Sequence, residues 1–145
     1  MKTIDIYTDA AWNHCKKKKH FKLGFLICDG EKEEHYWQIH NIEEFKNKWM
    51  FEEEFNINFA EMFSIIQSIK KIKENNTTIN IYTDSMISFT VLNKISKKTY
   101  RKRYHLLIEE FKTIKNRIKC NVNICWIPGH SDIYGNEIAN NLCKK

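Results

Sequence analysis

The stretch TIDIYTDA at residues 3–10 recurs almost unchanged as TINIYTDS at residues 78–85. Both copies are rich in the β-branched and aromatic residues that strands prefer, and each ends on an aspartate followed by a small residue. One interpretation is that two ordinary strands happen to be alike, with Asp9 and Asp84 capping the turns that follow. The other is that two strands carry two carboxylates to one place. The elements predicted for the rest of the chain distinguish between these two interpretations.

The sequence after the first copy predicts a hairpin. Residues 23–28 and 33–39 have the composition of strands, and Asp29-Gly30 between them is a turn signal. Residues 42–55 are acidic and aromatic without a clear period, so we expect an insertion that contains a helical turn.

Helices are predicted on both sides of the second copy. From Phe59 onward the apolar residues recur at helical spacing, with Asn56 or Asn58 as the expected cap and Glu61 in the first turn. The elements expected after the second copy are a short helix opened by Ser85, a longer helix with an apolar stripe from Tyr104 to Ile118, a strand at 121–127 and a short helix after Gly135.

This order of elements favours the second interpretation of the repeat. A strand, a crossover helix and a further strand predict that the two copies pair in parallel. Ligands bind at the carboxyl ends of parallel strands, and Asp9 and Asp84 both stand there, with Glu61 near the same edge. Three converging carboxylates repel one another unless a cation holds them, and hard oxygen ligands favour Mg²⁺ or Mn²⁺.

Length predicts a single domain, residues 1–145, and the alternation of strands and helices predicts an α/β fold. The 42% hydrophobic and 29% charged residues are ordinary for a globular chain. Five scattered cysteines and the absence of a signal-peptide pattern lead us to expect an intracellular protein, cytoplasmic or nuclear. No apolar run approaches the roughly 20 residues needed to span a bilayer, so we expect no membrane partner, and we expect a monomer. His14, Cys15 and His20 lack a second ligand pair at zinc spacing, so we expect no zinc site.

Charge is unevenly distributed along the chain, which carries a net charge of +6. Residues 93–119 hold ten Lys or Arg against two acids, whereas residues 30–54 hold eight acids against three lysines. Tyr100, Tyr104 and His105 are interleaved with the cations, as on a polyanion-binding surface, although a solvated helix face explains the charge equally well. The lysines at 16–19 either meet phosphate or keep a loop soluble.

Four blocks of the sequence resemble the motifs of type 1 ribonuclease H, in the order and spacing of that family. They are YTDA, NFAEM, YTDS and WIPGHSDIYGNEIAN, at residues 7–10, 58–62, 82–85 and 126–140. The resemblance implies a five-stranded mixed sheet flanked by helices, and cleavage of the RNA strand of an RNA–DNA hybrid with two divalent ions, Mg²⁺ or Mn²⁺. It also implies that Asp9, Glu61 and Asp84 are catalytic metal ligands and that His130 assists proton transfer.

The resemblance extends to substrate contacts. Asn58 matches a position close to the RNA 2′-hydroxyls, and Asn56 and Thr99 fall near positions that hold a DNA-strand phosphate. The basic stretch at 97–105 resembles a shortened form of a basic handle found in some members. The substrate-binding residues implied are Ala10, Ala11, Asn56, Asn58, Ser85, Lys98, Thr99 and Arg101.

Three departures from the family pattern bear on this interpretation. Ala10-Ala11 replaces the usual Gly-Ser, and Gly24 is what remains of a glycine-rich entry to the second strand. The fourth metal carboxylate is replaced by Asn140, whose amide oxygen can ligate but brings no charge. Asp132 and Glu137 are the nearby acids that could substitute for it. A catalytically weak or inactive hybrid-binding module is therefore the main alternative to an active nuclease, and another nuclease or transposase of the same broad fold is a more distant one.

Overall fold

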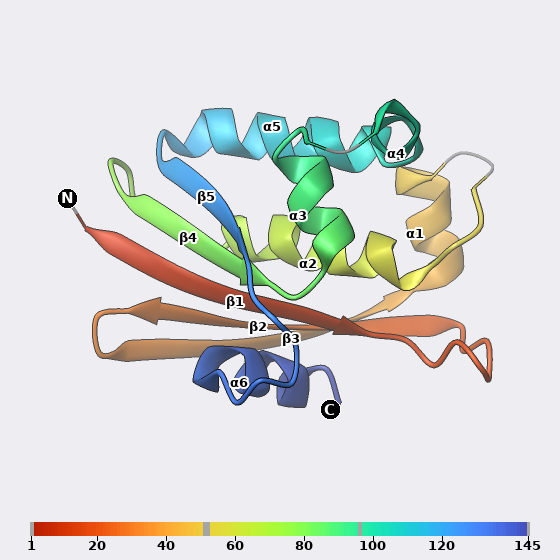
Figure 1. Cartoon of the computed structure of the whole chain (residues 1–145), viewed down its shortest axis with the longest axis horizontal. Coiled ribbons are helices and arrows are strands. Elements are labelled where there is room, and N and C mark those ends of the chain that lie inside the picture. The colour runs from red at the N-terminus through yellow and green to blue at the C-terminus, as the bar shows by residue number, and fades with distance from the viewer. Residues whose placement is uncertain (1, 51–52, 96, 145) are drawn as a thin grey trace.

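The computed structural model describes residues 2–50, 53–95 and 97–144, which form a five-stranded mixed sheet with helices on both faces (Figure 1). The sheet order is β3-β2-β1-β4-β5; β1, β2 and β3 are antiparallel neighbours, whereas β1, β4 and β5 are parallel. The predicted α/β architecture is confirmed. The strands are β1 (Thr3–Ala11), β2 (His20–Asp29), β3 (Lys32–Asn41), β4 (Thr78–Thr83) and β5 (Asn121–Trp126).

The repeated octapeptide is the centre of this sheet. Its two copies form β1 and β4, which pair in parallel and in equivalent register, so that Thr3 lies opposite Thr78 and Tyr7 opposite Tyr82. The two tyrosine rings stack with centroids 4.8 Å apart. Equal register brings the residues that end each copy to the same edge of the sheet, which explains why the sequence repeats.

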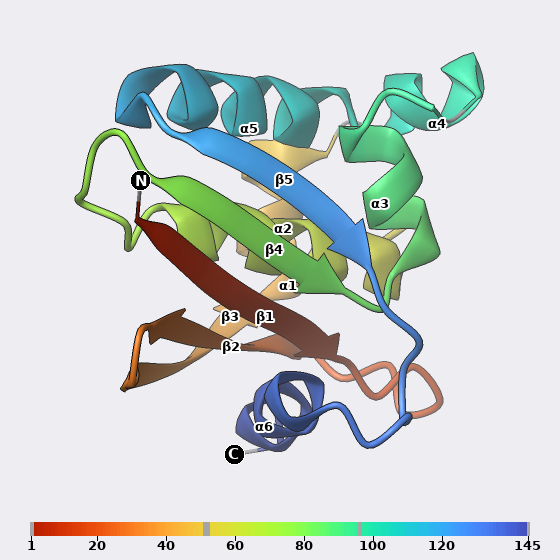
Figure 2. The same ribbon diagram turned by 60° about the vertical axis from the view of Figure 1, so that its left-hand side comes forward.

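The helices form two unequal layers. Among the described helices, α6 alone covers one face of the sheet, while the others lie on the opposite face, where α5 packs outside α2 (Figures 1 and 2). No helix of the described ranges is long and apolar enough to cross a membrane. The helices are α1 (Ile42–Trp49), α2 (Ile57–Ile69), α3 (Met86–Leu92), α4 (Lys98–Arg103), α5 (His105–Ile118) and α6 (Tyr134–Leu142).

The main core lies between the sheet and α2, which is buried along nearly its whole length. The helix begins at Ile57, two residues before the predicted start, and its cap is Asn56, whose side chain accepts a hydrogen bond from the backbone of Asn58. Glu61 is therefore the fifth residue of the helix and not in its first turn as predicted, because the helix begins earlier. It reaches the sheet edge and is 6% exposed.

The segment after β3 is more regular than the sequence suggested. Residues 42–49 form α1, whose Phe45 and Trp49 are buried on one face. Phe45 packs edge-on against Phe21 and Phe63, with ring centroids 5.1 and 5.0 Å apart. The predicted insertion is thus a helix that belongs to the aromatic part of the core; residues 51–52 of that prediction lie outside the described residues.

Helix α6 approaches the sheet closely because a glycine stands on each side of the contact, Gly24 on β2 and Gly135 on the helix itself. A Cβ on Gly24 of β2 would lie 2.8 Å from Cβ of Leu142 and 2.9 Å from the backbone nitrogen of Cys143, and it would collide with the carbonyl oxygen of Ala139. A Cβ on Gly135 would collide with the ring of Tyr7. Gly24 is also the cross-strand partner of Asp9, so the close approach occurs beside the carboxylates.

Candidate metal centre and nucleic-acid interface

Three carboxylates meet at the carboxyl ends of the parallel strands β1 and β4. Asp9 comes from the end of β1, Asp84 follows β4, and Glu61 reaches the same edge from α2. One oxygen of each side chain lies within 4.8 Å of the others. Asp9 is 4% exposed, Glu61 is also buried, and Asp84 is partly exposed. The convergence predicted from the repeat is present, and in the described ranges neither Asp132 nor Glu137 belongs to this cluster.

The cluster is electrostatically strained without a cation. Burial raises the pKa of Glu61 well above its ordinary value, and the negative charges of Asp9 and Asp84 raise it further. The pKa of Asp84 is also raised, by burial and then by Asp9, while a hydrogen bond from Asn136 and the nearby His130 lower it. Proximity and burial therefore both disfavour three simultaneous negative charges.

The backbone holds two of the carboxylates in place. The amide of Ala10 donates to Oδ1 of Asp9 at 2.9 Å and to Oε1 of Glu61 at 3.1 Å. The second oxygen of Glu61, Oε2, is buried and has no hydrogen-bond partner in the described structure. Buried polar atoms are normally partnered, and this one belongs to a set of hard oxygen ligands, so the residues present fit a Mg²⁺ or Mn²⁺ ion.

Helix α6 contributes two carboxamides to this cluster. Nδ2 of Asn140 donates to Oδ2 of Asp9 at 2.9 Å, and Nδ2 of Asn136, one turn earlier, donates to Oδ2 of Asp84 at 3.5 Å. Asn140 thus lies where the sequence placed it, beside the carboxylates. Asn136 was not predicted as a site residue, although it lies in the same motif block and is buried.

The loop between β5 and α6 passes over Asp84. A Cβ on Gly129 would lie 2.9 Å from Oδ2 of Asp84, which is a reason for glycine at this position. His130 follows, is exposed, and has a left-handed backbone with φ of 55°. The predicted histidine therefore stands at the rim of the carboxylate cluster, on a loop and not on a helix or strand.

Of the predicted substrate-binding residues, five lie around this edge. Ala10 and Ala11 end β1, Ser85 caps α3 by accepting from the backbone of Ser88, and Asn56 caps α2. Burial raises the pKa of the Tyr104 phenol, and the side chains of Asn56, Arg103 and Asn58 lower it in part, so Asn56 and Asn58 lie close to this ring. The other predicted contacts, Lys98, Thr99 and Arg101, lie on α4.

The basic segment divides into an exposed and a buried part. Helix α4 has no buried residue, so its cations face solvent. Tyr104 is different: it is 1% exposed and packs against Phe59 at 4.7 Å. Tyr104 therefore belongs to the apolar stripe and not to a polyanion-binding surface, because the chain turns inward between α4 and α5.

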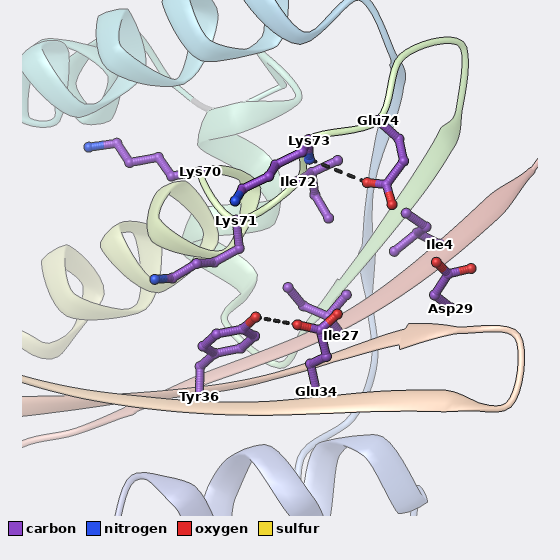
Figure 3. Close-up of a pocket in the computed structure, with 10 residues that line it drawn as sticks. All are labelled: Ile4, Ile27, Asp29, Glu34, Tyr36, Lys70, Lys71, Ile72, Lys73 and Glu74. Carbon is purple, nitrogen blue, oxygen red and sulfur yellow. Dashed lines mark hydrogen bonds between the residues drawn. The ribbon is translucent and has the colours of Figure 1, made fainter.

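Two cavities flank the sheet at opposite ends of β1. One, of about 790 Å³, lies between the β1–β2 loop, α1 and Asn56, beside the carboxylate end. The other, of about 460 Å³, is shown in Figure 3 and lies at the start of β1, where Ile4 forms part of its wall and Lys70, Lys71 and Lys73 line one side. It is about 17 Å from Asp9 along the strand, by the rise per residue.

The fold and the acidic site together define an RNase H-like α/β protein with a cluster of three carboxylates at one edge of its sheet. The sequence model of the RNase H family matches residues 1–145, and the chain belongs to this family. A search of curated proteins gave no match.

Proposed function

We propose that this protein is an endonuclease that hydrolyses the RNA strand of RNA–DNA hybrids with two Mg²⁺ ions, or Mn²⁺ as a substitute. The observation that supports the proposal best is the buried cluster of Asp9, Glu61 and Asp84, in which Oε2 of Glu61 lacks a partner. Membership of the RNase H family supports the choice of substrate.

Divalent ions, when bound, supply an activated water and stabilise the leaving 3′ oxygen of an in-line displacement at phosphorus. The chain's own part is to hold the ligands anionic and correctly aimed. The amide of Ala10 fixes one oxygen of Asp9 and one of Glu61, which leaves Oε2 of Glu61 for a cation. Asn140 holds Asp9 through its Nδ2 and has its own amide oxygen as a further neutral ligand.

His130 is proposed to move protons during the reaction. Its exposed position on the loop after Gly129 lets the imidazole reach the edge of the site, and it lies close enough to Asp84 to lower the pKa of that carboxyl. An imidazole changes its charge near neutral pH, which suits a group that donates to the departing oxygen and then exchanges with solvent.

Hybrid recognition is proposed to use the residues around the same edge. The backbone at Ala10 and Ala11 and the side chains of Asn58 and Ser85 would contact the RNA strand, whose 2′-hydroxyls distinguish it from DNA. Asn56 and the exposed face of α4 would hold phosphates of the DNA strand. The α4 residues in this proposal are Lys98, Thr99 and Arg101.

A second function is supported by Asn140. Its amide donates to an oxygen of Asp9 that a cation would otherwise take, and it brings no negative charge. A protein in which this bond persists would bind hybrids and cut them slowly or not at all. We place this binding module second because the three charged ligands are all present and close together.

One incubation separates the two functions. Labelled RNA–DNA hybrid is mixed with the protein in Mg²⁺ or in Mn²⁺, beside single-stranded RNA and duplex DNA. A nuclease cuts the hybrid alone, whereas a binding module shifts it in a gel and leaves it intact. Asp84→Asn should abolish cutting and leave hybrid binding unchanged or tighter, because less negative charge then faces the phosphates. Cutting at the wild-type rate by this variant would refute the metal-site assignment.

A further inference from the structure

The cavity beside the carboxylate end of β1 combines an aromatic floor with a cationic rim. Phe55 is buried beneath it, and Trp12, three residues after Asp9, stands edge-on to Phe55 with ring centroids 4.9 Å apart. Ile42 of α1 completes the apolar part. The volume of about 790 Å³ falls within the range of small-molecule sites, which are about 300–1,000 Å³.

The β1–β2 loop is folded in a way that directs its lysines to this cavity. Nε1 of Trp12 donates to the carbonyl of Lys18 at 2.8 Å, so the loop turns back to the edge of the indole. Lys17 has a left-handed backbone with φ of 44°, and the carbonyl of Lys19 accepts from the backbone of Ile42 at 2.8 Å, which ties the loop to α1. The lysine run is therefore held against α1 by defined contacts.

Charge at this cavity is predominantly positive. Four lysines line it, Lys17, Lys18, Lys19 and Lys46, against two acids, Glu43 and Glu54. Within the described ranges none of the four lysines forms an ion pair. Unpaired cations around an aromatic floor are the features with which proteins bind single-stranded nucleic acid, by phosphate attraction and base stacking.

We propose that this cavity binds an unpaired nucleotide of a strand that continues beyond the RNA–DNA hybrid. A duplex presents phosphates on its outside and keeps its bases stacked on one another. A phosphate of the hybrid can therefore reach Asn56 at the rim of the cavity, but the bases of the duplex do not reach the recessed aromatic floor. An unpaired nucleotide uses both parts, with its base on Trp12 and its phosphates on the lysines. Trp12 is three residues from Asp9, at most about 10 Å of extended chain, so the site adjoins the cleavage centre.

This proposal rests on hybrid binding, and it makes a separate claim about which hybrids bind best. Hybrids that end in a single-stranded overhang should bind more tightly than blunt hybrids of the same duplex length. One stacked base contributes about 1–3 kcal/mol, which is about 5- to 150-fold in affinity. We expect at least a fivefold gain for an overhang of the favoured strand and polarity.

The test measures dissociation constants by fluorescence anisotropy in the Asp84→Asn background, so that the probe is not cut. Probes are one blunt hybrid and four hybrids with five-nucleotide overhangs, one for each end of each strand. The triple variant Lys17→Ala, Lys18→Ala, Lys19→Ala should abolish the overhang gain. It should also flatten the salt dependence measured with the favoured overhang, by about 0.7 in slope for each phosphate that the variant no longer neutralises.

The matched control removes the same charge elsewhere. Alanine at Lys70, Lys71 and Lys73, which line the distant cavity of Figure 3, should leave the overhang gain unchanged. For the aromatic floor, Trp12→Phe keeps a ring but loses the Nε1 hydrogen bond to Lys18, whereas Trp12→Leu loses both. Trp12→Phe should therefore keep more of the gain than Trp12→Leu, with thermal unfolding measured for both to establish that they fold.

The result that would overturn the proposal is an equal affinity for blunt and overhanging hybrids, or a gain that both lysine triples reduce alike. Failure of the proposed nuclease function is a different result. In that case the wild-type protein does not cut the blunt hybrid in Mg²⁺ or Mn²⁺, while the overhang gain and its dependence on Lys17–Lys19 are still measured independently.

Discussion

Replacing Asn140 by aspartate tests how α6 stabilises the carboxylate cluster. In the wild-type protein, the Asn140 amide donates to Oδ2 of Asp9 at 2.9 Å. Asn140→Asp replaces the donor with a fourth acid in nearly the same volume. We expect the metal-free variant to be less stable than the wild type at pH 7, and expect divalent metal to reverse the difference.

The expected decrease in the free energy of unfolding follows from two contributions. A hydrogen bond to a charged group contributes about 1.5–3 kcal/mol, and the variant cannot form it. Two unit charges about 4 Å apart repel by about 4 kcal/mol at an effective dielectric constant of 20. Protonation of one acid limits that cost, so a net decrease of about 2–4 kcal/mol in the free energy of unfolding is expected. For a domain of this length, that lowers Tm by about 6–16 °C.

The assay is thermal unfolding by circular dichroism, first with a chelator and then across a titration of Mg²⁺ or Mn²⁺. Asn141→Asp is the matched control, because it makes the same chemical change on an exposed position of α6. With metal, Asn140→Asp should recover its Tm and cut hybrid at lower metal concentration than the wild type does. Equal decreases in Tm for the two variants without metal would refute the assigned role of the Asn140 hydrogen bond.

Three further changes test the rest of the site. The folded pKa of Glu61 lies well above its ordinary 4.5, so the folded metal-free protein retains a proton that the unfolded chain releases, and the free energy of unfolding should fall as pH rises above about 4.5. Denaturant titrations from pH 5 to 8 should show a shallower fall for Glu61→Gln than for the wild type. An equal fall in the two proteins would contradict this account. Gly24→Ala should cost about 1–3 kcal/mol by pushing α6 off the sheet, and an unchanged denaturant midpoint would mean that the packing relaxes freely. Replacing the four cations of α4 by alanine should weaken hybrid binding and reduce the slope of log affinity against log salt concentration by about 0.9 for each phosphate no longer neutralised. An unchanged slope would mean that α4 is a solvated helix face that does not contact phosphate. The four cations are Lys98, Arg101, Lys102 and Arg103.

The sheet was predictable because the repeat encodes its own register. Residues Thr3–Tyr7 pair with Thr78–Tyr82 one to one, so residues at equivalent positions of the repeat are also neighbours across the two strands. Helix α1 was not predicted as a regular element. Its buried residues, Phe45 and Trp49, are one turn apart, but the acidic residues around them obscured the period. Burial of those rings against Phe63, from a distant part of the sequence, is what makes the segment helical.

Some features of the candidate site were also predictable from the sequence, and others were not. Asp9 and Asp84 were predictable because parallel pairing brings the ends of β1 and β4 together. Glu61 was predictable because it lies near the start of α2, on the same edge. The hydrogen bond from Asn136 to Asp84 was not, because it depends on how closely α6 approaches the sheet. For Tyr104 the prediction was wrong. Its position among cationic residues suggested a binding surface, but the chain turns after α4 and buries the ring.

The contacts of α6 bear directly on whether the protein is a nuclease or a binding module. Gly24 and Gly135 let the helix come close enough for Asn140 to reach Asp9. A cation that replaces this amide at Oδ2 of Asp9 costs the cluster that hydrogen bond, about 1.5–3 kcal/mol, which is about 10- to 150-fold in affinity. Such a penalty raises the metal concentration that is needed, but it does not remove a site that still has three carboxylates. On the proposed nuclease function, we therefore expect an active enzyme with a high metal requirement and not an inert hybrid-binding protein.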